Sequence, residues 1–143
     1  MDARVTIITL GVENLGRALR FYRDGLGWNV SSASQGDIAF LKLSGVVLAL
    51  YPRALLASDA NLPSLGRAPF GGITLAQNVR EARMVDEGML AAEAAGARIL
   101  RPAKDAEWGG RSGYFACPDG HPWEIAWHPY FQFDENGALV LPD

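Results

Sequence analysis

The residues of this chain whose types suit chemistry gather in its second half, around Glu124 and His128. Both stand in segment 122–128, which predicts a strand. Side chains alternate between the faces of a strand, so Glu124 and His128 share one face and lie about 13 Å apart along it. At that separation they cannot bind one metal ion. Glu124 therefore has three interpretations: a structural hydrogen-bond acceptor, a partner for a ligand cation, or a general base whose pKa an apolar cavity raises.

Aromatic side chains accompany this carboxylate and suggest a binding site. Trp108 stands in the glycine-flanked loop Glu-Trp-Gly-Gly-Arg at 107–111, where an aromatic ring is free to cover a flat ligand. Arg111, in the same loop, is interpreted either as a partner for an anionic ligand group or as a solvated rim arginine. Tyr114 and His128 also belong to the predicted ligand-binding set. The alternative for each ring is a place in the hydrophobic core.

Composition excludes several other functions. Thirteen Lys and Arg against 16 Asp and Glu give a net charge of −3, which argues against a general nucleic-acid binder. The single cysteine, Cys117, is interpreted as a buried thiol and excludes an intrachain disulfide or a multi-cysteine zinc site. There is no apolar run of membrane-spanning length, no signal-peptide pattern, no phosphate loop and no dinucleotide fingerprint. We therefore expect a cytoplasmic protein with neither nucleic-acid nor membrane partners.

The elements that must position these residues occur in two similar halves. Runs of β-branched and apolar residues predict strands at 5–10, 28–32, 37–43 and 46–51, and again at 72–77, 97–101, 112–117 and 122–128. Apolar spacing of three and four residues predicts one helix between Asn14, its cap, and Gly25, and another over 79–95. Segments 52–69 and 102–111 are interpreted as loops, and 131–141 as a final hairpin.

The order β-α-β-β-β is thus predicted twice, and the tripeptide Ile-Thr-Leu at 8–10 recurs at 73–75. Asn14-Leu15 and Asn78-Val79 follow the two copies at similar distances. This repetition indicates a duplicated module. We expect one α+β domain over residues 1–143, with module 1 at about 4–52, a linker at about 53–69, module 2 at about 70–129 and a C-terminal tail at 130–143.

Two motifs in this pattern resemble a known family. They are LGVENL and ALRFYRDGLGW within 10–28, and GYFACPDGHPWEIAWH at 113–128. Both are similar to motifs of the vicinal oxygen chelate superfamily, which includes glyoxalase I, bleomycin-resistance proteins and extradiol dioxygenases. The resemblance spans about residues 5–129. It implies two βαβββ modules whose curved sheets surround a cavity, and it implies a homodimer.

The same resemblance carries over the four metal-ligand positions of the metal-dependent members. They fall on Ile7, on Gly72, on Leu48 or Ala49 according to the register, and on Glu124. Only Glu124 offers a donor atom, whereas catalytic metal sites normally use three protein ligands. We therefore predict no metal and no cofactor.

Together these observations predict metal-independent binding of a small apolar or aromatic molecule in the sheet-lined cavity. The predicted site residues are Glu124, Trp108, Arg111, Leu48, Tyr114 and His128. An alternative is a glyoxalase-type lyase or isomerase that uses Glu124 as a base with a divalent metal. A third possibility is a subunit whose role is oligomerisation.

Overall fold

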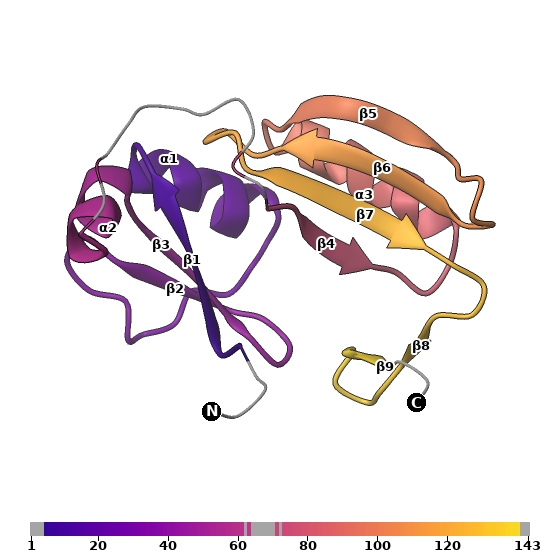
Figure 1. Ribbon diagram of the computed structural model, residues 1–143, viewed down its shortest axis with the longest axis horizontal. Helices are drawn as coiled ribbons and strands as arrows, with labels where there is room; N and C mark the ends of the chain where they lie inside the picture. The colour runs from indigo at the N-terminus through magenta and orange to yellow at the C-terminus, as the bar shows by residue number, and fades with distance from the viewer. Residues whose placement is uncertain (1–4, 62, 64–70, 72, 141–143) are drawn as a thin grey trace. The chain divides into compact units, whose positions relative to one another are not determined.

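The computed structural model describes residues 5–61, 63, 71 and 73–140, and the chain divides into two compact units, Met1–Gly71 and Gly72–Asp143. Each unit begins with a strand and a helix and then adds antiparallel strands, which confirms the predicted α+β fold with curved sheets (Figure 1).

The first unit contains one three-stranded sheet. Its strands are β1 (Ile7–Val12), β2 (Ala39–Lys42) and β3 (Val47–Pro52), in the order β1-β3-β2. β1 and β3 are parallel, and β2 and β3 are antiparallel. Helix α1 (Leu15–Leu19) continues into the π-helical turn η1 (Arg20–Gly25). The predicted cap is confirmed, because the Asn14 Oδ1 accepts a 2.7 Å hydrogen bond from the Arg17 N–H.

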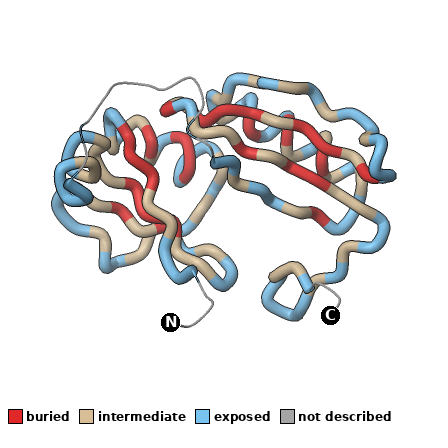
Figure 2. The backbone as a smooth tube through the Cα atoms, viewed as in Figure 1, coloured by how far each residue is buried: buried red, intermediate tan, exposed pale blue. Residues whose placement is uncertain are grey.

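One face of this sheet carries most of the core of the unit. Leu41, Leu48 and Leu50 are each at most 1% exposed, as are Phe21 and Tyr22 of η1 (Figure 2). The other face carries Ile7, Thr9, Gly11, Ala49 and Tyr51.

Two predictions for the first half are wrong. Segment 28–32 makes only a bridge between Val30 and Leu41 instead of a strand. Its serines turn the chain, since the Ser31 Oγ accepts a hydrogen bond from the Ala33 N–H at 3.2 Å. The predicted loop 52–69 begins with helix α2 (Arg53–Asp59). Pro52 precedes the helix with a φ of −53°, and the alanines and leucines that follow are strong helix formers.

The second unit repeats the arrangement with four strands. They are β4 (Leu75–Asn78), β5 (Arg98–Asp105), β6 (Arg111–Ala116) and β7 (Pro122–Trp127), in the order β4-β7-β6-β5. The first and last of them, β4 and β7, are again the parallel pair. Since β1 and β3 bear the same relation in the first unit, the duplication predicted from the sequence is confirmed in the topology.

Helix α3 (Arg83–Ala94) lies against this sheet and begins four residues later than predicted. The reason is that Val79 continues the sheet by donating its N–H to the Ala126 carbonyl at 2.9 Å. The prediction that 102–111 is entirely loop is also wrong, because β5 extends to Asp105. β5 is an edge strand with irregular register, which is where a residue such as Pro102 is tolerated.

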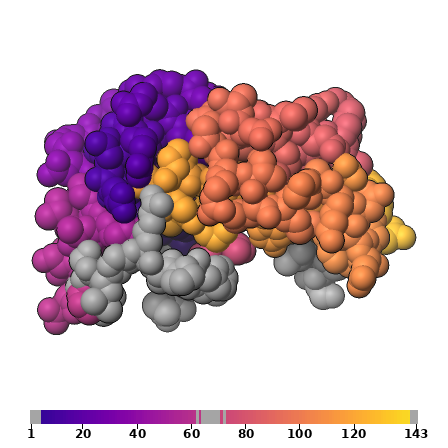
Figure 3. Space-filling model, turned by 90° about the horizontal axis from the view of Figure 1, so that it is seen from above, coloured from indigo at the N-terminus to yellow at the C-terminus, as the bar shows by residue number. Residues whose placement is uncertain are grey.

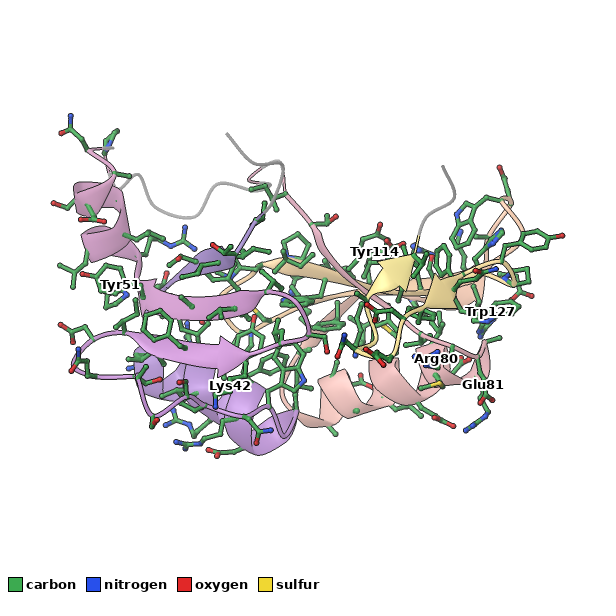
Figure 4. All side chains as sticks on the ribbon, turned by 90° about the horizontal axis from the view of Figure 1, so that it is seen from below. Lys42, Tyr51, Arg80, Glu81, Tyr114 and Trp127 are labelled. Carbon is green, nitrogen blue, oxygen red and sulfur yellow. The ribbon has the colours of Figure 1, made fainter. Side chains whose placement is uncertain are left out.

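The tail forms the predicted hairpin, with β8 (Gln132–Phe133) and β9 (Leu139–Val140). Arg80 attaches it to the unit, since its guanidinium lies 4.8 Å from the ring centroid of Phe133. The Trp127 indole N–H donates to the Arg80 carbonyl at 3.2 Å (Figure 4). Within the described part of the chain, no helix has the length and apolar character needed to cross a membrane.

Candidate functional site

The glycines of the second unit show which face of its sheet the helix covers. A Cβ atom on Gly113 would lie 2.8 Å from the Met89 Sδ, and one on Gly88 would lie 2.7 Å from the Ile125 Cδ1. Gly113 of β6 and Ile125 of β7 are cross-strand partners, so both face α3. Their neighbours Tyr114 and Glu124 therefore lie on the opposite side. We call this side the open face of the second sheet.

Glu124 and Tyr114 form a pair on the open face. They are direct cross-strand partners, and the interaction with the Glu124 carboxylate helps to keep the Tyr114 phenol protonated. Burial raises the pKa of the Tyr114 phenol above its usual value, and the bond to Glu124 raises it further. The pair thus combines a carboxylate acceptor with a hydroxyl that keeps its proton, an arrangement that suits hydrogen bonding to a ligand or proton transfer.

Arg101 is a third member of this cluster, and the sequence analysis missed it. Its guanidinium carbon lies 5.0 Å from the ring centroid of Tyr114. It donates to the Ser112 carbonyl at 3.2 Å and to the Ser112 Oγ at 2.7 Å. Stacking on an aromatic ring and bonding to a buried serine hold this side chain in place.

The register of β5 explains why Arg101 faces this way. Two register shifts, between Ile99 and Arg101 and between Arg101 and Lys104, each add one residue to β5 relative to β6. As a result, all three cations of the strand stand opposite open-face residues: Arg98 opposite Ala116, Arg101 opposite Tyr114 and Lys104 opposite Ser112. We call Arg98, Arg101 and Lys104 the basic row. A proline inside a predicted strand, as at Pro102, is the one sequence signal of such an irregularity.

Arg111 lies on the other face, beside α3. Its guanidinium makes two hydrogen bonds to the Asp86 carboxylate, at 2.7 and 2.8 Å, and one to Asp105 at 2.9 Å. These bonds raise the pKa of Arg111, and the bond to Arg111 lowers the pKa of the Asp86 carboxyl. The structure therefore places Arg111 in an ion-pair network on the helix side of the sheet, away from Glu124.

Trp108 and His128 come together in an aromatic cluster. Trp108 is 51% exposed, and its ring centroid lies 5.5 Å from that of His128. The His128 Nε2 lies 3.1 Å from the Trp108 carbonyl oxygen. The His128 ring also contacts those of Tyr130 and Phe131, at 5.2 and 5.5 Å. The loop tryptophan is thus an exposed ring supported from one side.

Cys117 is buried, as predicted, and its Sγ lies 3.4 Å from the His121 Nδ1. This contact within the turn after β6 was not foreseen.

The positions carried over from metal-dependent relatives lack donors. Leu48 pairs with Ile8 and belongs to the core face, whereas Ala49 shares the face of Ile7. The strand register therefore assigns the third position to Ala49. Neither Ile7 nor Ala49 has a ligand atom, and Gly72 lies outside the described residues. Among residues 5–61, 63, 71 and 73–140, no group of three or more His, Cys, Asp or Glu is placed to hold a metal ion. This donor set does not fit a catalytic divalent ion.

Comparisons with known proteins agree with this architecture. The family model of the Glyoxalase/Bleomycin resistance protein/Dioxygenase superfamily matches residues 4–125. A glyoxalase-related enzyme from Fulvimarina pelagi is 35% identical with a TM-score of 0.88, over 99% of this chain and 100% of that one. A glyoxalase/bleomycin resistance protein/dioxygenase from Nocardioides is 26% identical with a TM-score of 0.75, over 91% and 86% of the two chains.

A lactoylglutathione lyase from Agrobacterium tumefaciens shares the fold, with 22% identity and a TM-score of 0.69 over 92% of this chain and 98% of that one. No sequence among curated proteins matches the chain.

Proposed function

The chain belongs to the Glyoxalase/Bleomycin resistance protein/Dioxygenase superfamily, and we propose that it binds a small, largely apolar or aromatic molecule without a metal. The observation that carries this proposal is the Glu124–Tyr114 pair on the open face of the second sheet. Beside the pair stand the small, buried residues Ala116 and Ala126, which add apolar surface to this side of the sheet. The pair orients a ligand by hydrogen bonds, and the Tyr114 ring supplies an apolar surface.

A second candidate is a glyoxalase-type lyase or isomerase. It is favoured by the retained Glu124 and by the 35% identity to a glyoxalase-related enzyme. Glu124 would take a proton from the ligand, and Tyr114 would stabilise the carboxylate between turnovers. Because the donors at the other positions do not fit a divalent ion, no step of this candidate is assigned to a metal.

We further propose that the protein is a homodimer. Large apolar side chains on the surface support this proposal, among them Ile7 at 49%, Leu90 at 67% and Tyr130 at 83% exposure. Burying such residues between copies is favourable.

The test combines metal analysis with ligand-induced stabilisation. The purified protein is incubated with Zn²⁺, Ni²⁺, Mn²⁺ or Fe²⁺, desalted and analysed for bound metal, and its melting temperature is measured with neutral aromatic probes such as naphthamide and indole. We expect well under one equivalent of metal and a melting temperature that rises with probe concentration.

Glu124→Gln and Tyr114→Phe should weaken the probe effect. The matched controls Glu93→Gln, on the exposed surface of α3, and Tyr130→Phe, in an exposed turn, should not. Near one equivalent of metal that is lost in Glu124→Gln would refute metal independence. Equal probe effects in all four variants would refute the assignment of the site.

A further inference from the structure

The basic row is the strongest feature of the open face that the proposed function leaves unused. Its three residues are the only cations of β5, and the two register shifts bring all of them to one side. The chain as a whole has a net charge of −3, so this local excess of positive charge runs against the overall balance. β5 is the edge strand of its sheet and faces the viewer in Figure 3, where its atoms are uncovered.

Within the described segments, no carboxylate makes an ion pair with Arg98, Arg101 or Lys104. Arg111, one strand away on the other face, shows the contrast, because two carboxylates neutralise it. A half-buried guanidinium without a carboxylate is costly unless a polar group satisfies it, and Ser112 accepts only two of the N–H groups of Arg101. The remaining three are available to a ligand.

We propose that the open face binds ligands that carry an anionic group, and that Arg101 is the residue that binds this group. The inference rests on the proposed function and adds the chemical class of the ligand. Arg101 is held in advance by the Tyr114 ring and by Ser112, so little side-chain entropy is lost when an oxyanion binds. Arg98 and Lys104, both exposed, add attraction at longer range.

The strand order also limits the size of the ligand. β6 lies between β5 and β7, so the backbones at Arg101 and Glu124 are two strand spacings apart, about 10 Å, and the Arg101 side chain reaches across part of this distance to the Tyr114 ring. A ligand whose acidic group meets Arg101 and whose other end reaches Glu124 is therefore a small acid with an apolar body. Because the Arg101 guanidinium lies over the Tyr114 ring, the apolar body of the ligand lies beside that ring. The negative charge of Glu124 disfavours a second acidic group at the far end.

A basic edge strand has a simpler role as well, because cations at an edge discourage pairing with other sheets. That role requires charge on the strand but no particular arginine and no ligand. The experiment must therefore compare charged with neutral probes and one cation with another.

The test measures binding of three probes that share one ring system: naphthoate, naphthyl phosphate and the neutral naphthamide. Affinities are obtained by calorimetry for the wild type, Arg101→Gln, Arg101→Lys and a matched control. The control is Arg83→Gln on α3, which removes the same charge from an exposed side chain on the other side of the sheet. The melting temperature of each variant without probe shows that it is folded.

We expect at least one anionic probe to bind about ten-fold more tightly than naphthamide, an advantage that falls with added salt. Arg101→Gln should abolish this advantage, Arg101→Lys should keep part of it, and Arg83→Gln should leave it intact. The stronger of the two anions identifies the group as carboxylate or phosphate.

If naphthamide binds as tightly as both anions, or if Arg101→Gln and Arg83→Gln behave alike, the inference is wrong while the proposed binding function stands. If no probe of either kind binds the wild type, the proposed function fails and the inference fails with it.

Discussion

Replacing Gly113 with alanine tests the assignment of the two faces of the second sheet, on which the site depends. The glycine stands in β6 next to Tyr114, and a Cβ there would lie 2.8 Å from the Met89 Sδ, 3.0 Å from its Cγ and 3.1 Å from its Cε. The contact with the Sδ is too close and the other two are tight, so the Met89 side chain must move. Met89 is only 6% exposed and has little room to do so.

The magnitude follows from two opposing effects. Overpacking a core costs typically 1–3 kcal/mol, about 2 kcal/mol for a single methyl against a flexible thioether. Replacing glycine in a strand returns roughly 0.5–1 kcal/mol by lowering the entropy of the unfolded chain. Gly113 does not have a positive φ, so alanine adopts its backbone conformation. The free energy of unfolding should therefore fall by about 1–1.5 kcal/mol.

Urea unfolding of four proteins, wild type, Gly113→Ala, Met89→Ala and the double variant, measures this effect. Met89→Ala by itself should cost about 2–5 kcal/mol, because it leaves a cavity beside β6. In that background the alanine at 113 meets no side chain, so the substitution should become stabilising by a few tenths to about 1 kcal/mol. The sign of the effect thus reverses. If Gly113→Ala stabilises the wild type, α3 does not cover this face, and the placement of Tyr114 and Glu124 on the opposite side is refuted.

Four further predictions follow from the same structure. Leu48→Ala should lower the free energy of unfolding by about 2–5 kcal/mol in a urea titration, yet leave probe affinity unchanged, since Leu48 is a core residue 1% exposed. Because the pKa of Tyr114 is raised in the fold, its contribution to the free energy of unfolding is fully present below the unfolded value of about 10 and is lost as the pH rises through the folded value. The difference in unfolding free energy between wild type and Tyr114→Phe should therefore shrink in strong alkali, and a difference that does not change would contradict this prediction. Because the pKa of Asp86 is lowered in the fold, its contribution to the free energy of unfolding is fully present above the unfolded pKa of about 3.9 and is lost as the pH falls through the folded value. Asp86→Asn should therefore lower the urea midpoint at neutral pH and lower it less in acid. Light scattering after size-exclusion chromatography should give the mass of a dimer, and a monomer would remove that proposal.

Much of the fold is predictable because its signals are local. The Asn14 cap and the hairpin at 131–141 depend on residues within a few positions of each other, and both are confirmed. The errors occur where hydrogen bonding to a segment distant in the sequence decides which secondary structure forms. The residues of segment 28–32 predict a strand, but the segment forms only the bridge between Val30 and Leu41. Val79 is predicted to begin a helix, but its N–H bonds to the Ala126 carbonyl and so continues the sheet.

The residues of the candidate site show the same contrast between what local sequence predicts and what distant segments decide. The alternation of β7 places Glu124 on the same face of the strand as Ala126 and His128, and the resemblance to the family directs attention to it. Two residues predicted from the sequence to bind a ligand make other contacts in the structure. Leu48 lies in the core of the first unit, and Arg111 is bound to Asp86 and Asp105. Residue type indicated that an arginine belongs near the site, but the ion pair between Arg111 and Asp86 joins residues 25 positions apart.

The sequence by itself determines the duplicated module and its turns, because each of these is a property of residue type and short-range spacing. Only the tertiary structure decides which cations face the Glu124–Tyr114 pair. In an unbroken strand Arg101 would point away from Arg98, since side chains alternate. The two extra residues of β5 reverse that alternation, and an extra residue is defined only relative to the partner strand β6.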